Sequence, residues 1–439
     1  MTASLLTPTD PRATDQPVGF TALSLVCENC GTRFDPEPSA ICLTCLGPLV
    51  PVYEPNRSLP SRAEIQNRPR SLWRYREWLP FDGTPTLSPD SGFTPLLEAP
   101  DLARRLGVAR VWVKNDAVSH PTLSFKDRVV STAINAAHAF GLDVIGCAST
   151  GNLANAVAAH AARAGKAAWI FIPHDLEPAK VLATAIFAPK LVRVRGTYDD
   201  VNRLCAQVAD TFGWGVVNVN LRAYYGEGSK TMAFEIIEQL GWRAPTAVVA
   251  PMAGGALVTK LHRGFQDFAA AGLFDTALPR LYGAQAAGCA PIVRLVERGS
   301  GRIEPEIPAT IARSLAIGNP ADGPAAAKMI QQTGGWAEDV SDVEIVSGIQ
   351  ELAEHEGIFT ETAGGVTTAV TARLYAQGRI HPDELTVSCI TGNGLKTTDA
   401  LAGQYQQERA VRPRLAEFDA YIRELDGVAE PELAVAGGN

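Results

Sequence analysis

The chain has 439 residues and a formal net charge of −8, because 39 Lys and Arg stand against 47 Asp and Glu. Hydrophobic residues make up 46% and charged residues 20% of the chain, which excludes a disordered, collagen-like or disulfide-framework protein. The acidic balance also excludes a protein whose main task is to neutralise nucleic-acid phosphates, since that task needs clustered Lys and Arg.

The N-terminal stretch, residues 1–22, has neither a charged leader nor an apolar core, which predicts a disordered tail and not a secretory signal. We therefore expect a cytoplasmic protein. The longest uncharged run, residues 144–162, contains Ser149, Asn152 and His160, which are costly to bury in hydrocarbon, so we expect no membrane partner.

Two CxxC pairs in the segment 23–52 predict a zinc-ribbon-like element. In a reducing cytoplasm such pairs more often bind a tetrahedral Zn²⁺ than form chance disulfides, and a metal-free ribbon is the other alternative. Four thiolates leave no open coordination position, so the expected zinc is structural. Gly31 and Gly47 follow the pairs and suit tight turns. The expected metal ligands are Cys27, Cys30, Cys42 and Cys45.

From about residue 90 to 410, β-rich runs alternate with helical patterns, which predicts parallel strands wrapped by helices. The expected strands cover residues 110–115, 143–149, 167–173, 190–196, 246–252, 280–286 and 385–391. The expected helices cover residues 125–141, 152–165, 198–213, 229–241, 256–272 and 366–378.

Ligands of open α/β sheets bind beyond the carboxyl ends of the strands, so loops that pass from a strand into a helix are informative. In the first such loop, PTLSFKDR, Lys126 lies at the start of a helix for which Ser124 is a suitable N-cap. The helix dipole lowers the pKa of an amine placed there, as a nucleophile requires. An ordinary surface lysine is the alternative interpretation.

Three further loops have polar or glycine-rich sequences. Residues 149–152, STGN, offer donors for a carboxylate, although a capped turn explains them as well. Gly254 and Gly255 allow backbone N–H groups to close around a phosphate, or allow close packing of a strand on a helix. In the TGNGLK loop, Thr391 and Lys396 are candidates to contact a ring or an anion.

Taken together, PTLSFKDR, STGN, AGGAL and TGNGLK resemble the pyridoxal-phosphate enzymes of the tryptophan synthase β-subunit fold type, and among them the threonine synthase family. The segments GFTPLLEAP, EGSKTMAFEI and EGIFTETAGG support this resemblance, which covers roughly residues 20–400. It implies an α/β fold of two open, mostly parallel sheets wrapped by helices. A zinc-ribbon-like N-terminus also occurs in one branch of that family.

The resemblance implies a domain division and a homodimer. The expected parts are a disordered tail (1–22), a zinc-ribbon-like segment (23–52), a large cofactor-binding domain (53–134 and 221–410), a small domain (135–220) that closes over the ligand, and a C-terminal tail or helix (411–439).

The resemblance also implies roles for single residues. Lys126 would carry pyridoxal 5′-phosphate and exchange protons with the substrate, Asn152 would bind the ring hydroxyl of the cofactor, and Thr391 would face its pyridine nitrogen. The implied phosphate cradle is Ala253, Gly254, Gly255 and Ala256. The implied partners of the substrate α-carboxylate are Ser149, Thr150 and Gly151.

The implied reaction converts O-phospho-L-homoserine and water into L-threonine and phosphate. Two motifs depart from the family. The AGGAL loop lacks the asparagines of the familiar GNAGN, and Tyr225 holds the place of an arginine that would bind the substrate phosphate. We hypothesise that Arg222 supplies the anion clamp instead, with a plain surface loop residue as the alternative.

Two other functions use the same motifs differently. A β-replacement or elimination enzyme on the same scaffold, similar to cysteate synthase, would take O-phosphoserine and sulfite. A non-catalytic module would use the ribbon to bind a partner. The segment 23–52 contains a single basic residue, Arg33, so we expect no nucleic-acid partner.

Overall fold

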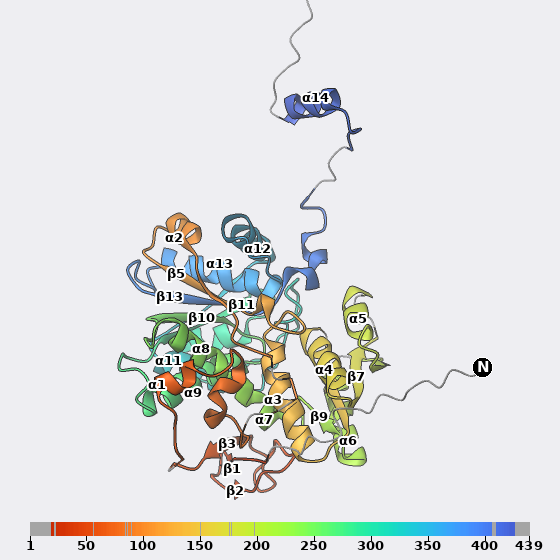
Figure 1. The fold of residues 1–439 in the computed structure, drawn as a ribbon, viewed down its shortest axis with the longest axis vertical. Coiled ribbons are helices and arrows are strands. Elements are labelled where there is room, and N and C mark those ends of the chain that lie inside the picture. Colours follow the sequence, from red (N-terminus) through yellow and green to blue (C-terminus); the bar gives the residue numbers. More distant parts are fainter. Residues whose placement is uncertain are drawn as a thin grey trace, which may run out of the picture. The chain divides into compact units, whose positions relative to one another are not determined.

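A computed structural model of the protein describes residues 19–425 except 22, 56, 84, 86, 89, 150, 175, 177, 197 and 406–409. Most of the predicted N-terminal tail and the end of the predicted C-terminal tail therefore lie outside the described residues, as does Thr150. The chain divides into two compact units, residues 1–400 and residues 401–439. The first unit contains all the sheets of the described chain (Figure 1).

The larger sheet has the strand order β12-β11-β10-β13-β5-β4. Five of its strands are parallel, and β4 pairs antiparallel with β5 at the edge. The strands are β4 (Leu96–Glu98), β5 (Val111–Asn115), β10 (Ala247–Pro251), β11 (Arg280–Ala286), β12 (Ala337–Val340) and β13 (Thr386–Ile390). Every residue of β10 and β13 is buried, as expected of central strands covered by helices on both faces.

The smaller sheet has the order β8-β7-β6-β9, and all its strand pairs are parallel. Its strands are β6 (Val144–Ala148), β7 (Ala167–Pro173), β8 (Lys190–Val194) and β9 (Gly215–Val216). Helix α3 (Lys126–Ala139) lies in the chain between β5 of the larger sheet and β6 of the smaller one. The predicted fold class, two open and mostly parallel sheets wrapped by helices, is confirmed.

Helices cover both sheets (Figure 1). The α-helices besides α3 are α1 (Arg62–Gln66), α2 (Pro100–Leu106), α4 (Asn152–Arg163), α5 (Pro178–Ala185), α6 (Tyr198–Phe212), α7 (Arg222–Gly228), α8 (Lys230–Gln239), α9 (Ala256–Ala270), α10 (Pro291–Arg298), α11 (Gly323–Gln332), α12 (Asp342–Glu356), α13 (Thr362–Ala376) and α14 (Leu415–Leu425). Short 3₁₀ helices are η1 (Leu72–Trp78), η2 (Asp116–Val118), η3 (Gly394–Lys396) and η4 (Thr398–Leu401). None of the helices in the described part of the chain is long and apolar enough to cross a bilayer.

The predicted strands agree with the structure within about two residues, whereas several short elements were not predicted. Strand β12 has the sequence AEDV, whose two acidic residues are poor strand formers, and pairing with β11 decides its conformation. Helix α12 follows at once and begins with a capping box between Ser341 and Glu344.

The N-terminal segment forms a three-stranded antiparallel sheet of β1 (Leu23–Cys27), β2 (Arg33–Phe34) and β3 (Leu49–Tyr53). Gly31 has a φ of +73°, as expected of the first turn. At the second turn the left-handed residue is Leu46 and not the predicted Gly47. Gly47 is needed for close approach instead, because a Cβ there would lie 2.9 Å from Cys27 Sγ.

This small sheet shares the main hydrophobic core. Leu23, Leu25 and Leu49 belong to the same buried cluster as the residues of α3 and the larger sheet. The Phe20 ring packs 5.3 Å from the ring of Tyr224 in α7 and 4.6 Å from that of Phe140 at the end of α3. The ribbon is therefore an integral part of the first unit rather than a pendant module.

Candidate active site

Lys126 is the first residue of α3 and is partly exposed. The predicted N-cap at Ser124 is wrong: Phe125 holds the cap position without a side-chain cap, and Ser124 Oγ has no hydrogen-bond partner among the described residues. The loop is held by Asp127 instead, whose carboxylate accepts hydrogen bonds from Thr122 N at 3.0 Å and from Thr122 Oγ1 at 2.6 Å. The Asp127 carboxylate, in the first turn of α3, thus binds the loop that precedes the helix, and the helix N-terminus has no side-chain cap.

A fully buried ionic cluster anchors the first turn of α3. The Arg128 guanidinium pairs with Asp116 at 2.6 Å and with Glu235, and Lys114 Nζ lies 2.6 Å from Glu235 Oε2. All four side chains have no exposed surface. Burial opposes ionisation of Glu235, but the charges of Arg128 and Lys114 outweigh it and lower its pKa to about 2. The cluster fixes the helix that carries Lys126.

The amine of Lys126 contacts a tyrosine that sequence reasoning did not select. Lys126 Nζ donates to Tyr225 Oη at 2.9 Å, and Tyr225 belongs to α7. The sequence signal was the departure of this position from the family arginine. The structure thus places a hydroxyl directly on the candidate nucleophile.

The STGN loop leads into α4. Ser149 Oγ accepts hydrogen bonds from Gly151 N at 3.1 Å and from Ala154 N at 3.0 Å, so it shapes the loop and caps the helix. A Cβ at Gly151 would meet no atom of the described residues within 4 Å, so these residues leave open space in front of the loop. That space suits a small carboxylate, and the role of Thr150 lies outside the described residues.

Asn152 contacts a second residue that sequence reasoning missed. Its Nδ2 lies 2.9 Å from both carboxylate oxygens of Glu361, at the start of α13. Burial raises the pKa of Glu361, and Asn152 and the charge of Lys396 oppose this shift in part. A Cβ at Gly392 would overlap the Glu361 carboxylate, so the glycine after Thr391 makes room for it. The segment ETAGG was the only sequence signal for Glu361.

The loop from Ala253 to Ala256 joins β10 to α9. Gly255 has a φ of +94° and its Cβ would lie 2.9 Å from a carbonyl oxygen, so only glycine fits there. Within the described part of the chain, a Cβ at Gly254 would meet a single atom, 4.0 Å away. The first N–H groups of a helix have no intrahelical acceptor, so this open loop suits a phosphate.

The loop with Thr391 lies against the loop with Lys126. Phe125 N donates to the Thr391 carbonyl oxygen at 2.8 Å, and Ser124 pairs with Gly392 as an isolated bridge. Thr391 itself is buried. The structure therefore brings Lys126 and Thr391 together, as their position after neighbouring strands β5 and β13 requires.

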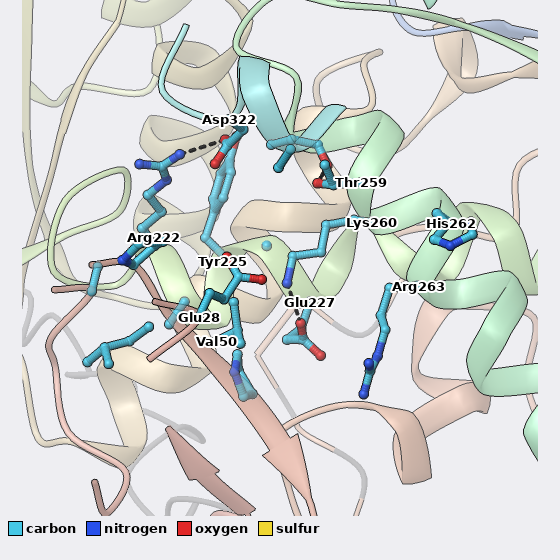
Figure 2. A pocket seen from close by; sticks show the side chains of 18 of the residues that line it. Glu28, Val50, Arg222, Tyr225, Glu227, Thr259, Lys260, His262, Arg263 and Asp322 are labelled. Atoms are coloured by element: carbon cyan, nitrogen blue, oxygen red, sulfur yellow. Dashed lines mark hydrogen bonds and ion pairs between the residues drawn. The ribbon is translucent and has the colours of Figure 1, made fainter. Parts of the chain in front are cut away.

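Arg222 lies one turn before Tyr225 on the wall of a cavity of about 370 Å³ (Figure 2). Its Nη2 pairs with Asp322 Oδ2 at 2.6 Å, and 41% of its side chain is exposed. A phosphate bound there would share the guanidinium with Asp322. The proposed anion clamp of Arg222 stays a prediction.

These residues fit pyridoxal phosphate. A partly exposed amine, an open glycine loop at a helix N-terminus and a polar loop with empty space in front of it supply attachment, a phosphate cradle and a carboxylate site. Attachment at one end of the cofactor and a phosphate cradle at the other would fix the orientation of its ring.

The four cysteines of the ribbon converge. Their Sγ atoms all lie within 4.8 Å of one another, and two pairs, Cys27 with Cys45 and Cys30 with Cys42, are separated by 3.4 Å and 3.7 Å. Tetrahedral Zn²⁺ with Zn–S bonds of about 2.3 Å separates its sulfurs by about 3.8 Å. All eight cysteines are thiols rather than disulfides. The cluster therefore fits a zinc ion.

Comparison with known proteins agrees with this geometry. The family model described as "Pyridoxal-phosphate dependent enzyme" matches residues 87–392. The threonine synthase of Methanocaldococcus jannaschii is 36% identical over 379 residues, which cover 85% of this chain and 93% of that protein. The threonine synthase of Methanosarcina acetivorans is 32% identical, covering 92% and 99%.

Solved structures show the same fold at low identity. Maize serine racemase superposes with a TM-score of 0.59 and 19% identity, covering 70% of this chain and 91% of that one. The processed form of threonine deaminase isoform 2 from Solanum lycopersicum superposes with a TM-score of 0.58 and 19% identity, covering 78% and 86%.

Proposed function

Because this chain belongs to the threonine synthase family of pyridoxal-phosphate-dependent enzymes, we propose that it converts O-phospho-L-homoserine and water into L-threonine and phosphate. The observation that carries the proposal is the amine of Lys126, which lies partly exposed at the start of α3 beside the Thr391 loop. The alternative cysteate-synthase-like reaction is not favoured, since the curated relatives are threonine synthases.

In this proposal each loop has one task. Pyridoxal phosphate, when bound, supplies the electron sink that makes loss of the substrate α-proton accessible. Lys126 holds the cofactor and moves protons at its Nζ. The N–H groups of residues 253–256 bind the cofactor phosphate, and Thr391 faces the ring nitrogen.

The STGN loop, residues 149–152, orients the cofactor and the substrate relative to each other. Asn152 contacts the ring hydroxyl of the cofactor. Glu361 binds the amide of Asn152 and so restricts the rotation of the Asn152 side chain. Ser149, Thr150 and Gly151 bind the substrate carboxylate. Arg222 binds the phosphate group of the substrate, which is the leaving group of the reaction.

The proposal has three structural parts beyond the reaction. The four cysteines of the ribbon bind one structural Zn²⁺, supported by their convergence. The enzyme acts as a homodimer in the cytoplasm, the common state of enzymes of this size. Residues 135–220 close over the ligand as a small domain, supported by the separate sheet β6–β9.

A product assay and a lysine variant test the proposed function. Purified protein is expected to make threonine from O-phosphohomoserine and to give no cysteate from O-phosphoserine and sulfite. Lys126→Ala is expected to abolish both the visible absorbance of the bound cofactor and the activity, whereas the exposed Lys328→Ala keeps both. A Lys126→Ala protein with full activity contradicts the proposal.

A further inference from the structure

The short helix α7 is fastened to the ribbon on both sides of Tyr225. The preceding residue, Tyr224, donates its hydroxyl to the carbonyl oxygen of Glu37 at 2.9 Å. Two residues after Tyr225, the carboxylate of Glu227 accepts a hydrogen bond of 2.7 Å from Tyr53 Oη, at the end of β3. Both contacts come from the three-stranded N-terminal sheet (β1–β3) and its loops, which also carry the cysteine pairs and are called the ribbon here.

The contact between Tyr53 and Glu227 is part of a buried charge network. Glu227 is only 2% exposed and pairs with Lys260 at 2.8 Å (Figure 2). It also pairs with Lys230 at 2.6 Å. The Lys230 ammonium also lies 4.7 Å from the centre of the Tyr53 ring. Groups of this kind are costly to bury unless every partner is in place, so the network holds the ribbon and α7 in one arrangement.

Helix α7 also lies directly on α3. A Cβ at Gly228 would come within 2.5 Å of the Arg128 carbonyl oxygen, and Thr132 Oγ1 lies 3.4 Å from the Tyr225 carbonyl oxygen. Arg128 is two residues beyond Lys126 and is locked by its buried ion pairs. A shift of α7 on α3 would therefore change the distance between the Tyr225 hydroxyl and the Lys126 amine.

We propose that the ribbon is a working part of the active site: through Tyr53 and Glu227 it holds Tyr225 in place, and the Tyr225 hydroxyl orients the amine of Lys126. A tyrosine hydroxyl can accept from an ammonium and donate to a neutral amine, so it holds Lys126 in either protonation state. Tyr225 is then a positioning residue for Lys126. The inference rests on the proposed attachment of pyridoxal phosphate to Lys126, but on no particular substrate.

The test measures how fast Lys126 captures its cofactor. Full-length protein is stripped of cofactor with hydroxylamine and mixed with pyridoxal phosphate, and the rise of visible absorbance is followed at increasing cofactor concentration. Tyr225→Phe removes only the hydroxyl, and we expect the saturated rate to fall about tenfold while the half-saturating concentration changes less than about twofold. A looser cofactor site would raise the half-saturating concentration instead.

Two further variants separate the ribbon from general stability. Tyr53→Phe removes the hydroxyl on Glu227, and we expect a saturated rate about threefold below wild type. The matched control is Tyr75→Phe, which removes another buried hydroxyl bound to a carboxylate, Glu238 at 2.5 Å, between η1 and α8. The control is expected to lose as much thermal stability as Tyr53→Phe and to keep the wild-type rate.

The outcomes decide the inference. It is overturned by a wild-type rate in Tyr225→Phe, or by equal rates in Tyr53→Phe and Tyr75→Phe. The Tyr53→Phe and Tyr225→Phe double variant should react as slowly as Tyr225→Phe alone, and additive losses contradict a shared route. If Tyr225→Phe does not fold, the comparison of Tyr53→Phe with Tyr75→Phe decides alone. A wild-type protein that captures the cofactor but makes no threonine refutes the proposed function and leaves this test standing.

Discussion

At the scale of single residues, the reactive end of the site depends on pairs of polar atoms set within hydrogen-bond distance. The Tyr225 hydroxyl accepts a hydrogen bond from the amine of Lys126, and the Glu361 carboxylate accepts one from the side-chain amide of Asn152. The chemistry therefore depends on orientation as much as on the identity of the residues.

The proposed role of Arg222 predicts how its substitution changes substrate binding. A bidentate guanidinium contributes about 2 kcal/mol to binding of a phosphate, so Arg222→Ala is expected to raise KM for the phosphorylated substrate about 30-fold and to change kcat little. Steady-state kinetics measures the two separately. Arg263→Ala is the matched control, because it lies on the same cavity wall, is 52% exposed and also pairs with a carboxylate, Asp267. An unchanged KM in Arg222→Ala would refute the anion clamp.

At the scale of the element, buried ion pairs of Arg128 and Lys114 with Glu235 hold α3 in place, and they require an ionised Glu235. Glu235→Gln leaves Arg128 and Lys114 without their shared carboxylate charge, and we expect a loss of about 3 kcal/mol in the free energy of unfolding. Urea denaturation measures it. The exposed pair of Arg105 and Glu351 gives the control, since Glu351→Gln should cost less than about 1 kcal/mol.

The same carboxylate predicts a pH dependence. The pKa of Glu235 is about 2 in the folded chain, against about 4.3 in the unfolded one. Its ionised form therefore stabilises the fold above about pH 4, and this contribution is lost as the pH falls toward 2. Urea midpoints between pH 5 and 3 should fall more steeply in wild type than in Glu235→Gln. Parallel slopes would show that folding does not lower the pKa of Glu235 and would contradict this prediction.

The position of the ribbon in the core predicts how zinc removal affects the stability of the protein. Because Cys27 and Cys42 belong to the main buried cluster, loss of zinc should destabilise the first unit as a whole and not the ribbon alone. We expect about one Zn²⁺ per chain by mass spectrometry, and a fall in Tm of about 5 °C or more with a chelator or in Cys30→Ser. Cys205→Ser, in the core of the smaller sheet, should retain the metal. A metal-free protein with the same Tm would contradict a structural zinc.

At the scale of the first unit, two contacts bridge the helix of the smaller sheet and the elements of the larger one across the site. Asn152 of α4 binds Glu361 of α13, and Asn155 Oδ1 accepts from Lys396 Nζ at 3.0 Å. All four residues line a cavity of about 260 Å³. They connect the proposed small domain to the large one at this cavity.

Glu361→Gln tests this bridge. A glutamine cannot accept the Asn152 hydrogens through two oxygens, and it removes the negative charge beside Lys396. We expect the dissociation constant of pyridoxal phosphate to rise about fivefold to tenfold, measured by titration of the stripped protein. Glu354→Gln, on the exposed face of α12, is the control. An unchanged dissociation constant would show that Asn152 needs no support from Glu361.

The sequence by itself determined the α/β pattern, the positions of the glycine loops, the cysteine pairs and the choice of Lys126. These features are local: apolar runs, glycine positions and CxxC spacing act over a few residues. Parallel strands then bring their carboxyl ends to one edge, which placed Lys126 beside Thr391.

Only the tertiary structure decided what surrounds these residues. Tyr225 is 99 positions from Lys126 and Glu361 is 209 positions from Asn152, so neither contact has a local signal. The same holds for Gly47. The turn does not require a left-handed conformation at this residue, but the close approach of Cys27 leaves no room for a Cβ. Contacts of this kind depend on how helices and sheets dock, and docking is set by packing of the whole core rather than by spacing along the chain.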